Sequence, residues 1–151
     1  MFPANQPAFL TMTSCSEGTK GKGNDGYNVD FGGTLFDSYA DHPRVRIFIP
    51  RLNLYTTAAG RYQILAKTYD AYKERLGLTD FSPAAQDAIA LQLIKERGAL
   101  SYIDSGDLDS AILKCAPIWA SFPTAGYEGQ RENKLAQMRD WFTQAGGVLN
   151  G

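Results

Sequence analysis

Residues 12–19 read Met-Thr-Ser-Cys-Ser-Glu-Gly-Thr, and this stretch indicates where the first helix of the chain ends. Apolar side chains recur at a spacing of three up to and within it: Phe9, Met12 and Cys15. Pro7 suits the first turn of such a helix. Gly18 is the residue type that most often adopts the left-handed conformation just beyond a helix. We therefore predict a short helix whose last residue is Glu17.

Glu17 is then a carboxylate at the wrong end of a helix, because the backbone dipole is negative there. The dipole, together with any burial, raises the pKa of Glu17 and keeps it protonated near neutral pH. A protonated Glu at the edge of a cleft is what a general acid needs, and residues that break a local rule often mark function. The alternative interpretation is an exposed Glu at a frayed helix end.

The composition is that of an ordinary globular protein. The chain has 151 residues, of which 44% are hydrophobic and 21% charged, which favours one domain over residues 1–151. A net charge of −1 without a Lys or Arg run argues against a nucleic-acid partner. Cys15 and Cys115 are expected to be buried free thiols. With one His, they form no metal cluster, so we expect no metal, no cofactor and a monomer.

No targeting or membrane segment is evident. The first residues lack the basic start and apolar core of a signal peptide. No apolar run is long enough to cross a bilayer. We expect synthesis in the cytoplasm and no stable membrane association.

A small antiparallel sheet is predicted near the N-terminus. Residues 27–31 alternate like a strand, Gly-Gly at 32–33 suits a turn, and residues 34–36 return. Residues 44–49 are the best third strand, and Pro50 ends it. His42, between an Asp and a Pro, is expected to be a structural or exposed turn residue.

Helical periodicity dominates the remainder. The predicted helices are 61–76, 83–97, 99–105, one from Asp107 that Pro117 breaks, and about 131–145. Two irregular loops, 50–60 and 122–130, are placed to flank a groove. The class is α+β, with helices around one buried helix and a small sheet, which is the general plan of lysozyme-like enzymes.

Three motifs recur in one order along the chain: Ser16-Glu17-Gly18, Ala59-Gly60-Arg61-Tyr62-Gln63 and Thr124-Ala125-Gly126-Tyr127. This order resembles the signature of lytic transglycosylases, and more closely that of the lambda-type phage endolysins. Further similar segments are Gly-Tyr at 26–27, Asp-His-Pro at 41–43, Gly-Leu-Thr-Asp-Phe-Ser-Pro at 77–83, Ile-Lys-Glu-Arg-Gly-Ala-Leu at 94–100 and Ile-Trp-Ala-Ser at 118–121. The ordered set covers nearly the whole chain and is specific.

The resemblance implies that Glu17 is the single catalytic acid and base. It also implies a glycan groove between two lips, 50–60 and 122–130, with substrate-binding candidates Gln63, Tyr127, Arg61, Tyr62 and Tyr55. The chain departs from the family pattern at Asn28, where an Asp is expected after the Gly-Tyr pair. Asp30 follows two residues later.

The implied reaction is cleavage of the β-1,4 bond between N-acetylmuramic acid and N-acetylglucosamine in peptidoglycan glycan strands. Glu17 would protonate the leaving oxygen and then accept the proton of the C6 hydroxyl, which attacks C1 and closes a 1,6-anhydro ring. Ordinary glycosidases use two carboxylates. Here the nucleophile belongs to the substrate, so proximity replaces the second residue.

Two alternatives stay open. A hydrolytic muramidase would use a second carboxylate, with Asp30 ahead of Asp37 and Asp41. A non-catalytic glycan-binding module would bind wall without releasing fragments. For the endolysin, the resemblance implies host cytoplasm until a separate holin-type pore releases the protein to the periplasm and cell wall.

Overall fold

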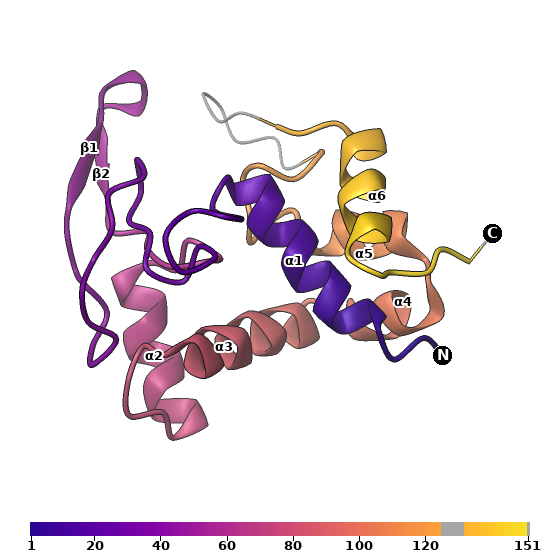
Figure 1. Ribbon diagram of the computed structural model, residues 1–151, viewed down its shortest axis with the longest axis horizontal. Helices are drawn as coiled ribbons and strands as arrows, with labels where there is room; N and C mark the ends of the chain where they lie inside the picture. Colours follow the sequence, from indigo (N-terminus) through magenta and orange to yellow (C-terminus); the bar gives the residue numbers. More distant parts are fainter. Residues whose placement is uncertain (125–131, 151) are drawn as a thin grey trace. The chain divides into compact units, whose positions relative to one another are not determined.

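The computed structural model describes residues 1–124 and 132–150, and the fold over these ranges is α+β (Figure 1). The elements in chain order are α1 (Asn5–Glu17), β1 (Ile47–Ile49), the 3-10 helix η1 (Pro50–Leu52), β2 (Leu54–Thr56), α2 (Ala66–Leu76), α3 (Pro83–Glu96), α4 (Leu100–Ser105), α5 (Leu108–Cys115) and α6 (Leu135–Gln144). No helix in the described ranges is long and apolar enough to cross a membrane.

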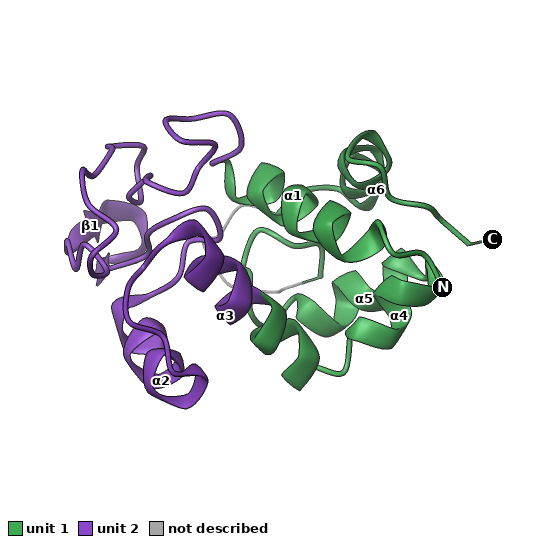
Figure 2. Ribbon diagram, turned by 60° about the horizontal axis from the view of Figure 1, so that its bottom comes forward, with its two compact units in different colours: residues 1–18, 91–151 green, residues 19–90 purple. Residues whose placement is uncertain are grey.

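The chain divides into two compact units (Figure 2). Unit 1 is Met1–Gly18 with Leu91–Gly151, and unit 2 is Thr19–Ala90, so α3 begins in unit 2 and ends in unit 1. The single catalytic domain expected over residues 1–151 stays a prediction.

Unit 1 is helical, and α1 packs against α4 and α6. Phe9 of α1 is fully buried and meets Phe122 edge to face, with ring centroids 6.1 Å apart. Asn5 is also fully buried, and its amide fixes the start of α1. It donates to the carbonyls of Ile103 at 2.9 Å and Val148 at 3.0 Å, and accepts from the Val148 N–H at 2.8 Å. These bonds tie α1 to α4 and to the C-terminal segment.

The predicted end of α1 is confirmed. The helix ends at Glu17, and Gly18 adopts φ 79° with its N–H directed to the carbonyls of Cys15 and Ser14. Glycine carries this left-handed conformation without a steric penalty. The carboxyl group of Glu17 therefore leaves the chain in the last turn of a helix.

Both cysteines are free, as expected, but only Cys115 is buried and Cys15 is partly exposed. Asp107 caps α5 by accepting from the N–H of Ser110. The helix ends at Cys115, two residues before Pro117, as the sequence predicts.

Unit 2 holds the sheet and a buried histidine. β1 and β2 form an antiparallel pair in which Ile47 faces Thr56 and Ile49 faces Leu54. His42 is 2% exposed and accepts the Arg44 N–H on Nδ1 at 2.9 Å, so its Nε2 carries the proton that bonds the Ile64 carbonyl at 2.8 Å. Burial lowers the pKa of His42. The structural interpretation of this residue is confirmed.

The predicted helix 61–76 is wrong over its first turn. α2 begins only at Ala66, because residues 59–64 fold back through a bridge between Ala59 and Ile64. Gln63, placed in a helical turn by its sequence context, instead lies in a tight turn with φ 53°.

The predicted sheet is correct in kind and position but differs in its strands. Residues 27–36 form a single bridge, between Val29 and Leu35, in place of a regular hairpin. The strand expected at 44–49 is confined to β1. The segment 50–60 is no irregular loop, because η1 turns the chain and β2 pairs with β1. The last helix also begins four residues later than predicted, at Leu135 instead of 131.

Candidate active site

The carboxyl group of Glu17 lies in unit 1 against a serine from a distant part of the chain. The Ser121 hydroxyl donates to Oε2 of Glu17 at 2.5 Å. Burial raises the pKa of Glu17 to about 7, and the Ser121 hydrogen bond opposes that rise. The group is therefore protonated below neutral pH and loses its proton near pH 7, the range in which a carboxyl can act as both acid and base. The raised pKa agrees with the sequence prediction.

Ser121 belongs to a chain of hydrogen bonds whose direction is fixed at its far end. The amide Nδ2 of Asn133 only donates, and it bonds the Ser16 hydroxyl oxygen at 3.0 Å. The Ser16 and Ser121 hydroxyls are 2.6 Å apart. Because the Ser121 proton goes to Glu17, the proton between the two serines comes from Ser16. The bonds therefore run Asn133 to Ser16 to Ser121 to Glu17.

This hydrogen-bond chain is held in place by the backbone. Asn133 also donates its backbone N–H to the Ser121 carbonyl at 2.8 Å and its side-chain amide to the Ser16 carbonyl at 3.1 Å. Ser16 is 8% exposed. In a site sheltered from water, hydrogen bonds that form a chain polarise and strengthen one another. The last bond of this chain, from Ser121 to Glu17, is strengthened in this way. The arrangement stabilises the carboxylate that forms when Glu17 gives up its proton.

The two serines stand in segments that the sequence motifs mark, Ser-Glu-Gly at 16–18 and Ile-Trp-Ala-Ser at 118–121, but their link to Glu17 was not predicted. Asn133 carried no signal, because its partners lie 12 and 117 residues away in sequence.

Gln63 lies in unit 2, where its backbone has a strained conformation that its own side chain stabilises through hydrogen bonds to nearby carbonyls. Its φ of 53° is uncommon for a residue other than glycine. Its amide nitrogen donates to the carbonyls of Gly60 at 2.9 Å and Val29 at 3.2 Å. The amide oxygen accepts no hydrogen bond from any residue in the described ranges and is partly exposed with the side chain. Strain of this kind is often found at binding sites, and the oxygen suits a hydroxyl or acetamido N–H.

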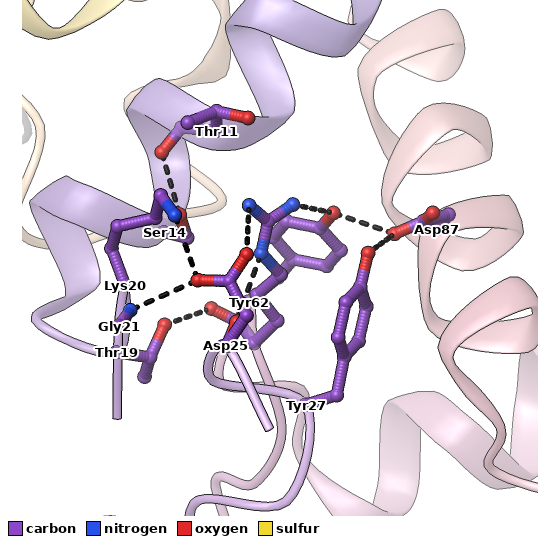
Figure 3. A network of polar contacts seen from close by, with 10 residues as sticks. Thr11, Ser14, Thr19, Lys20, Gly21, Asp25, Tyr27, Tyr62 and Asp87 are labelled. Atoms are coloured by element: carbon purple, nitrogen blue, oxygen red, sulfur yellow. Dashed lines mark hydrogen bonds and ion pairs between the residues drawn. The ribbon is translucent and has the colours of Figure 1, made fainter. Parts of the chain in front are cut away.

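Arg61 and Tyr62, two further predicted site residues, are buried in unit 2, and Figure 3 shows Tyr62 and Tyr27 directed at Asp87. Arg61 is 7% exposed and donates to the Tyr62 hydroxyl at 3.0 Å, while Tyr62 is fully buried and donates to Asp87 at 2.6 Å. Tyr27 donates to the same Asp87 oxygen at 2.9 Å. On its other side, Arg61 reaches the carbonyl of Asp25 at 3.2 Å. The buried hydrogen bonds of these two side chains thus stabilise the turn that contains Gln63. Direct contact of Arg61 or Tyr62 with a glycan stays a prediction.

Tyr55 lies on β2, in the surface of the hairpin. It faces Phe48 across the strand pair, with ring centroids 5.1 Å apart. The two residues are 55% and 44% exposed, and the Arg46 guanidinium lies 4.4 Å above the Tyr55 ring. An exposed aromatic surface of this kind is typical of a binding face.

The remaining predicted features are placed as follows. Glu17 is in unit 1, and Tyr55, Arg61, Tyr62 and Gln63 are in unit 2. Tyr127 and most of the second lip lie outside the described residues. Among the described residues no three His, Cys, Asp or Glu side chains are grouped to hold a metal ion.

Comparison with known proteins decides the family. The Endolysin family matches residues 7–149, nearly the whole chain. The chain belongs to the Endolysin family. The endolysin of Escherichia phage lambda is 52% identical over 147 residues, which cover 94% of this chain and 91% of that protein. The endolysin of Escherichia phage P2 is 44% identical over 156 residues, covering 95% and 94%.

Solved structures confirm the lysozyme-like fold of this endolysin. Bacteriophage lambda lysozyme in complex with a chitohexasaccharide matches with a TM-score of 0.93 and 49% identity over 99% of both chains. A second structure of lysozyme from bacteriophage lambda matches with a TM-score of 0.89 and 48% identity. The resemblance to lambda-type endolysins seen in the sequence is thereby confirmed.

Replacing Ser121 with Ala is expected to shift the pH dependence of this endolysin. The Ser121 bond lowers the pKa of Glu17, so its loss raises that pKa above 7 and moves the alkaline limb of activity to higher pH. The turnover rate should fall about tenfold, because the carboxylate loses its donor. The pH–rate profile on purified wall measures both effects. The control is Ser105→Ala, which removes a hydroxyl that bonds the Tyr102 carbonyl and should leave the profile unchanged.

Proposed function

We propose that this endolysin degrades peptidoglycan as a lytic transglycosylase that forms 1,6-anhydro-N-acetylmuramic acid. The observation that carries the proposal is the single carboxyl group of Glu17, with a pKa near 7 and a chain of donors directed at it. A mechanism with one acid and base needs a group that exchanges its proton at neutral pH. This group meets the requirement.

The reaction balances with Glu17 alone. Protonated Glu17 gives its proton to the glycosidic oxygen as the bond to C1 of N-acetylmuramic acid breaks. Ser121 donates to the resulting carboxylate. The C6 hydroxyl of the same sugar attacks C1 and passes its proton to Glu17, which closes the anhydro ring and restores the acid. No water enters the products, and the nucleophile is positioned by its own ring.

Unit 2 supplies the groups that suit a glycan. The amide oxygen of Gln63, which accepts no hydrogen bond from a described residue, suits an acetamido N–H or hydroxyl, and the exposed rings of Tyr55 and Phe48 suit the flat face of a sugar. Lambda lysozyme, the structural relative, binds a chitohexasaccharide in its complex. These observations support a glycan strand as the substrate.

Mass spectrometry of the fragments released from purified peptidoglycan tests the proposal. The expected fragments resist borohydride reduction and are each one water lighter than hydrolytic products, because the C1 aldehyde is locked in the anhydro ring. Reducible ends would overturn the transglycosylase mechanism and favour a hydrolytic muramidase. Binding to wall without soluble fragments would favour the glycan-binding module.

The muramidase alternative rests on Asp30 as the second carboxylate. The Asp30 side chain is 5% exposed and makes no hydrogen bond with a described residue, and burial raises its pKa. No donor among the described residues orients this carboxyl, whereas the Ser121 hydroxyl orients that of Glu17. Asp30 is therefore better explained by a different kind of site.

The same proposal implies how the protein reaches the cell wall. An endolysin that acts on the wall from a cytoplasmic site of synthesis needs a separate holin-type pore. Fractionation of cells that express the chain with and without such a pore tests this, with wall damage expected only when the pore is present.

A further inference from the structure

Unit 2 contains a concavity that the proposed reaction does not use. It has a volume of about 830 Å³ and is formed between residues 30 and 47, within one unit of the chain. Most of its wall is apolar: Phe31, Leu35, Phe36, Pro43, Val45 and Ile47. Leu35 and Val45 are about half exposed, at 50% and 45%, so the concavity opens to solvent. An open apolar concavity with a few polar groups is the usual form of a small-ligand site.

Asp30 forms part of this wall, and it is the charged group there whose lack of a hydrogen-bond donor most needs an explanation. The residue is 5% exposed, yet its carboxyl oxygens receive no hydrogen bond from any described residue. Its backbone is bonded, since its N–H donates to the Thr34 carbonyl and its carbonyl accepts from the Gly33 N–H. In the described ranges the buried side-chain oxygen without a hydrogen-bond partner is the Tyr69 hydroxyl, so the Asp30 carboxyl oxygens still reach solvent at the wall of the concavity. A largely desolvated carboxyl without a donor is an open position for a ligand that donates to it.

The charges that line the concavity indicate which kind of donor group would bind at Asp30. Asp37 and Asp41 also line the concavity, whereas no Lys or Arg does. Arg44 pairs with Asp41 and with Asp70 outside the wall, so it neutralises one of the three carboxylates. Asp30 and Asp37 have no such partner among the described residues. The lining therefore carries an excess of negative charge beside apolar side chains.

We propose that this concavity binds an aliphatic primary ammonium group, with the ammonium at Asp30 and the methylene stem against the apolar wall. Long amines bury their stems on apolar surface and keep their charge at a polar partner. In peptidoglycan this group is the free side-chain amine of a diamino acid in a peptide stem, and this part of the inference rests on the proposed function. The site gives the endolysin a preference for strands whose stems carry free amines. A bare divalent cation is a weaker fit, since no described group of three His, Cys, Asp or Glu is placed to hold one.

Acetylation of the wall amines tests the inference on the natural substrate. Purified peptidoglycan is treated with acetic anhydride, and fragment release is compared with that from untreated wall. The wild-type chain should act about fivefold faster on the untreated wall, mainly through KM. Asp30→Asn should act equally on both, because its amide carries no charge. The matched control is Asp140→Asn, an exposed residue of unit 1 outside the concavity, which should keep the wild-type preference.

The outcomes separate this site from a catalytic Asp30. An Asp30→Asn variant that is inactive on both walls would overturn the ammonium site and favour the muramidase. A wild-type chain with equal rates on both walls would overturn the ammonium site and leave the proposed function intact.

A binding measurement keeps the inference testable without any wall activity. Nα-acetyl-lysine amide is titrated into the protein and followed by NMR, with Nα-acetyl-norleucine amide as the uncharged comparison. The lysine compound should shift the amide signals of residues 30–47, and the norleucine compound and the Asp30→Asn variant should show at least tenfold weaker effects. Equal shifts with both compounds would overturn the proposal.

Discussion

Replacing Glu17 with Gln is expected to abolish fragment release from peptidoglycan, with a loss of about 10³-fold or more in rate. The amide of Gln cannot donate a proton to the glycosidic oxygen and cannot accept one from the C6 hydroxyl, so both halves of the proposed reaction fail. Release of soluble anhydro-sugar fragments from purified wall measures the effect. Glu74→Gln, an exposed change on α2, is the control and should retain full activity.

The Glu17→Gln variant should fold normally and resist unfolding better at alkaline pH. Gln keeps an oxygen that accepts from Ser121. The folded pKa of about 7 lies above the ordinary value of 4.5, so the contribution of Glu17 to stability is complete below pH 4.5 and is lost as pH rises through 7. This difference in pKa corresponds to a loss of up to about 3 kcal/mol in the free energy of unfolding at alkaline pH. The variant does not undergo this loss, because Gln does not ionise. Urea unfolding at pH 5 and pH 8.5 measures it. An active variant, or an equal pH dependence in both proteins, would contradict the assignment.

The sequence predicts the position of Glu17 because local signals determine it. A helix with apolar side chains at a spacing of three, followed by glycine, ends at the same residue in most surroundings. The free cysteines and the cap of α5 are likewise local features, and the structure agrees with each. The class of fold follows from the same helical patterns and from the motif order.

The sequence does not predict the features that depend on distant partners. Tyr62 and Leu65 continue the apolar spacing of α2, yet the bridge from Ala59 to Ile64 keeps residues 61–65 out of that helix. β2 forms because its strand partner β1 is present, so its apolar residues look like a loop when considered alone. Asn133 contacts Ser16 only after the chain has folded. Tertiary contacts thus decide the details of the site that local propensity leaves open.

The close fit of Gly60 against Gln86 explains why the Ala-Gly-Arg-Tyr-Gln motif contains its glycine. Gly60 adopts φ +82°, and a Cβ there would lie 2.3 Å from the Gln86 amide oxygen. Gln86 is fully buried and cannot move aside, because its oxygen accepts from the Arg61 N–H at 2.9 Å and its nitrogen donates to the carbonyls of Tyr27 and Phe81. The turn that carries Gln63 is built on this contact.

Gly60→Ala is accordingly expected to destabilise the chain by about 3 kcal/mol, combining left-handed strain with overpacking of a rigid neighbour. Urea denaturation measures the loss. Gly32→Ala is the matched control, because Gly32 has φ +91° but nothing within 4 Å of an added Cβ, so only the strain of about 1 kcal/mol applies. Equal losses in the two variants would show that Gln86 yields and that the contact does not constrain the motif. A larger loss at Gly60, together with weaker glycan binding at temperatures where the variant stays folded, would show that the contact with this buried amide holds the turn of Gln63 in the conformation that the proposed function requires.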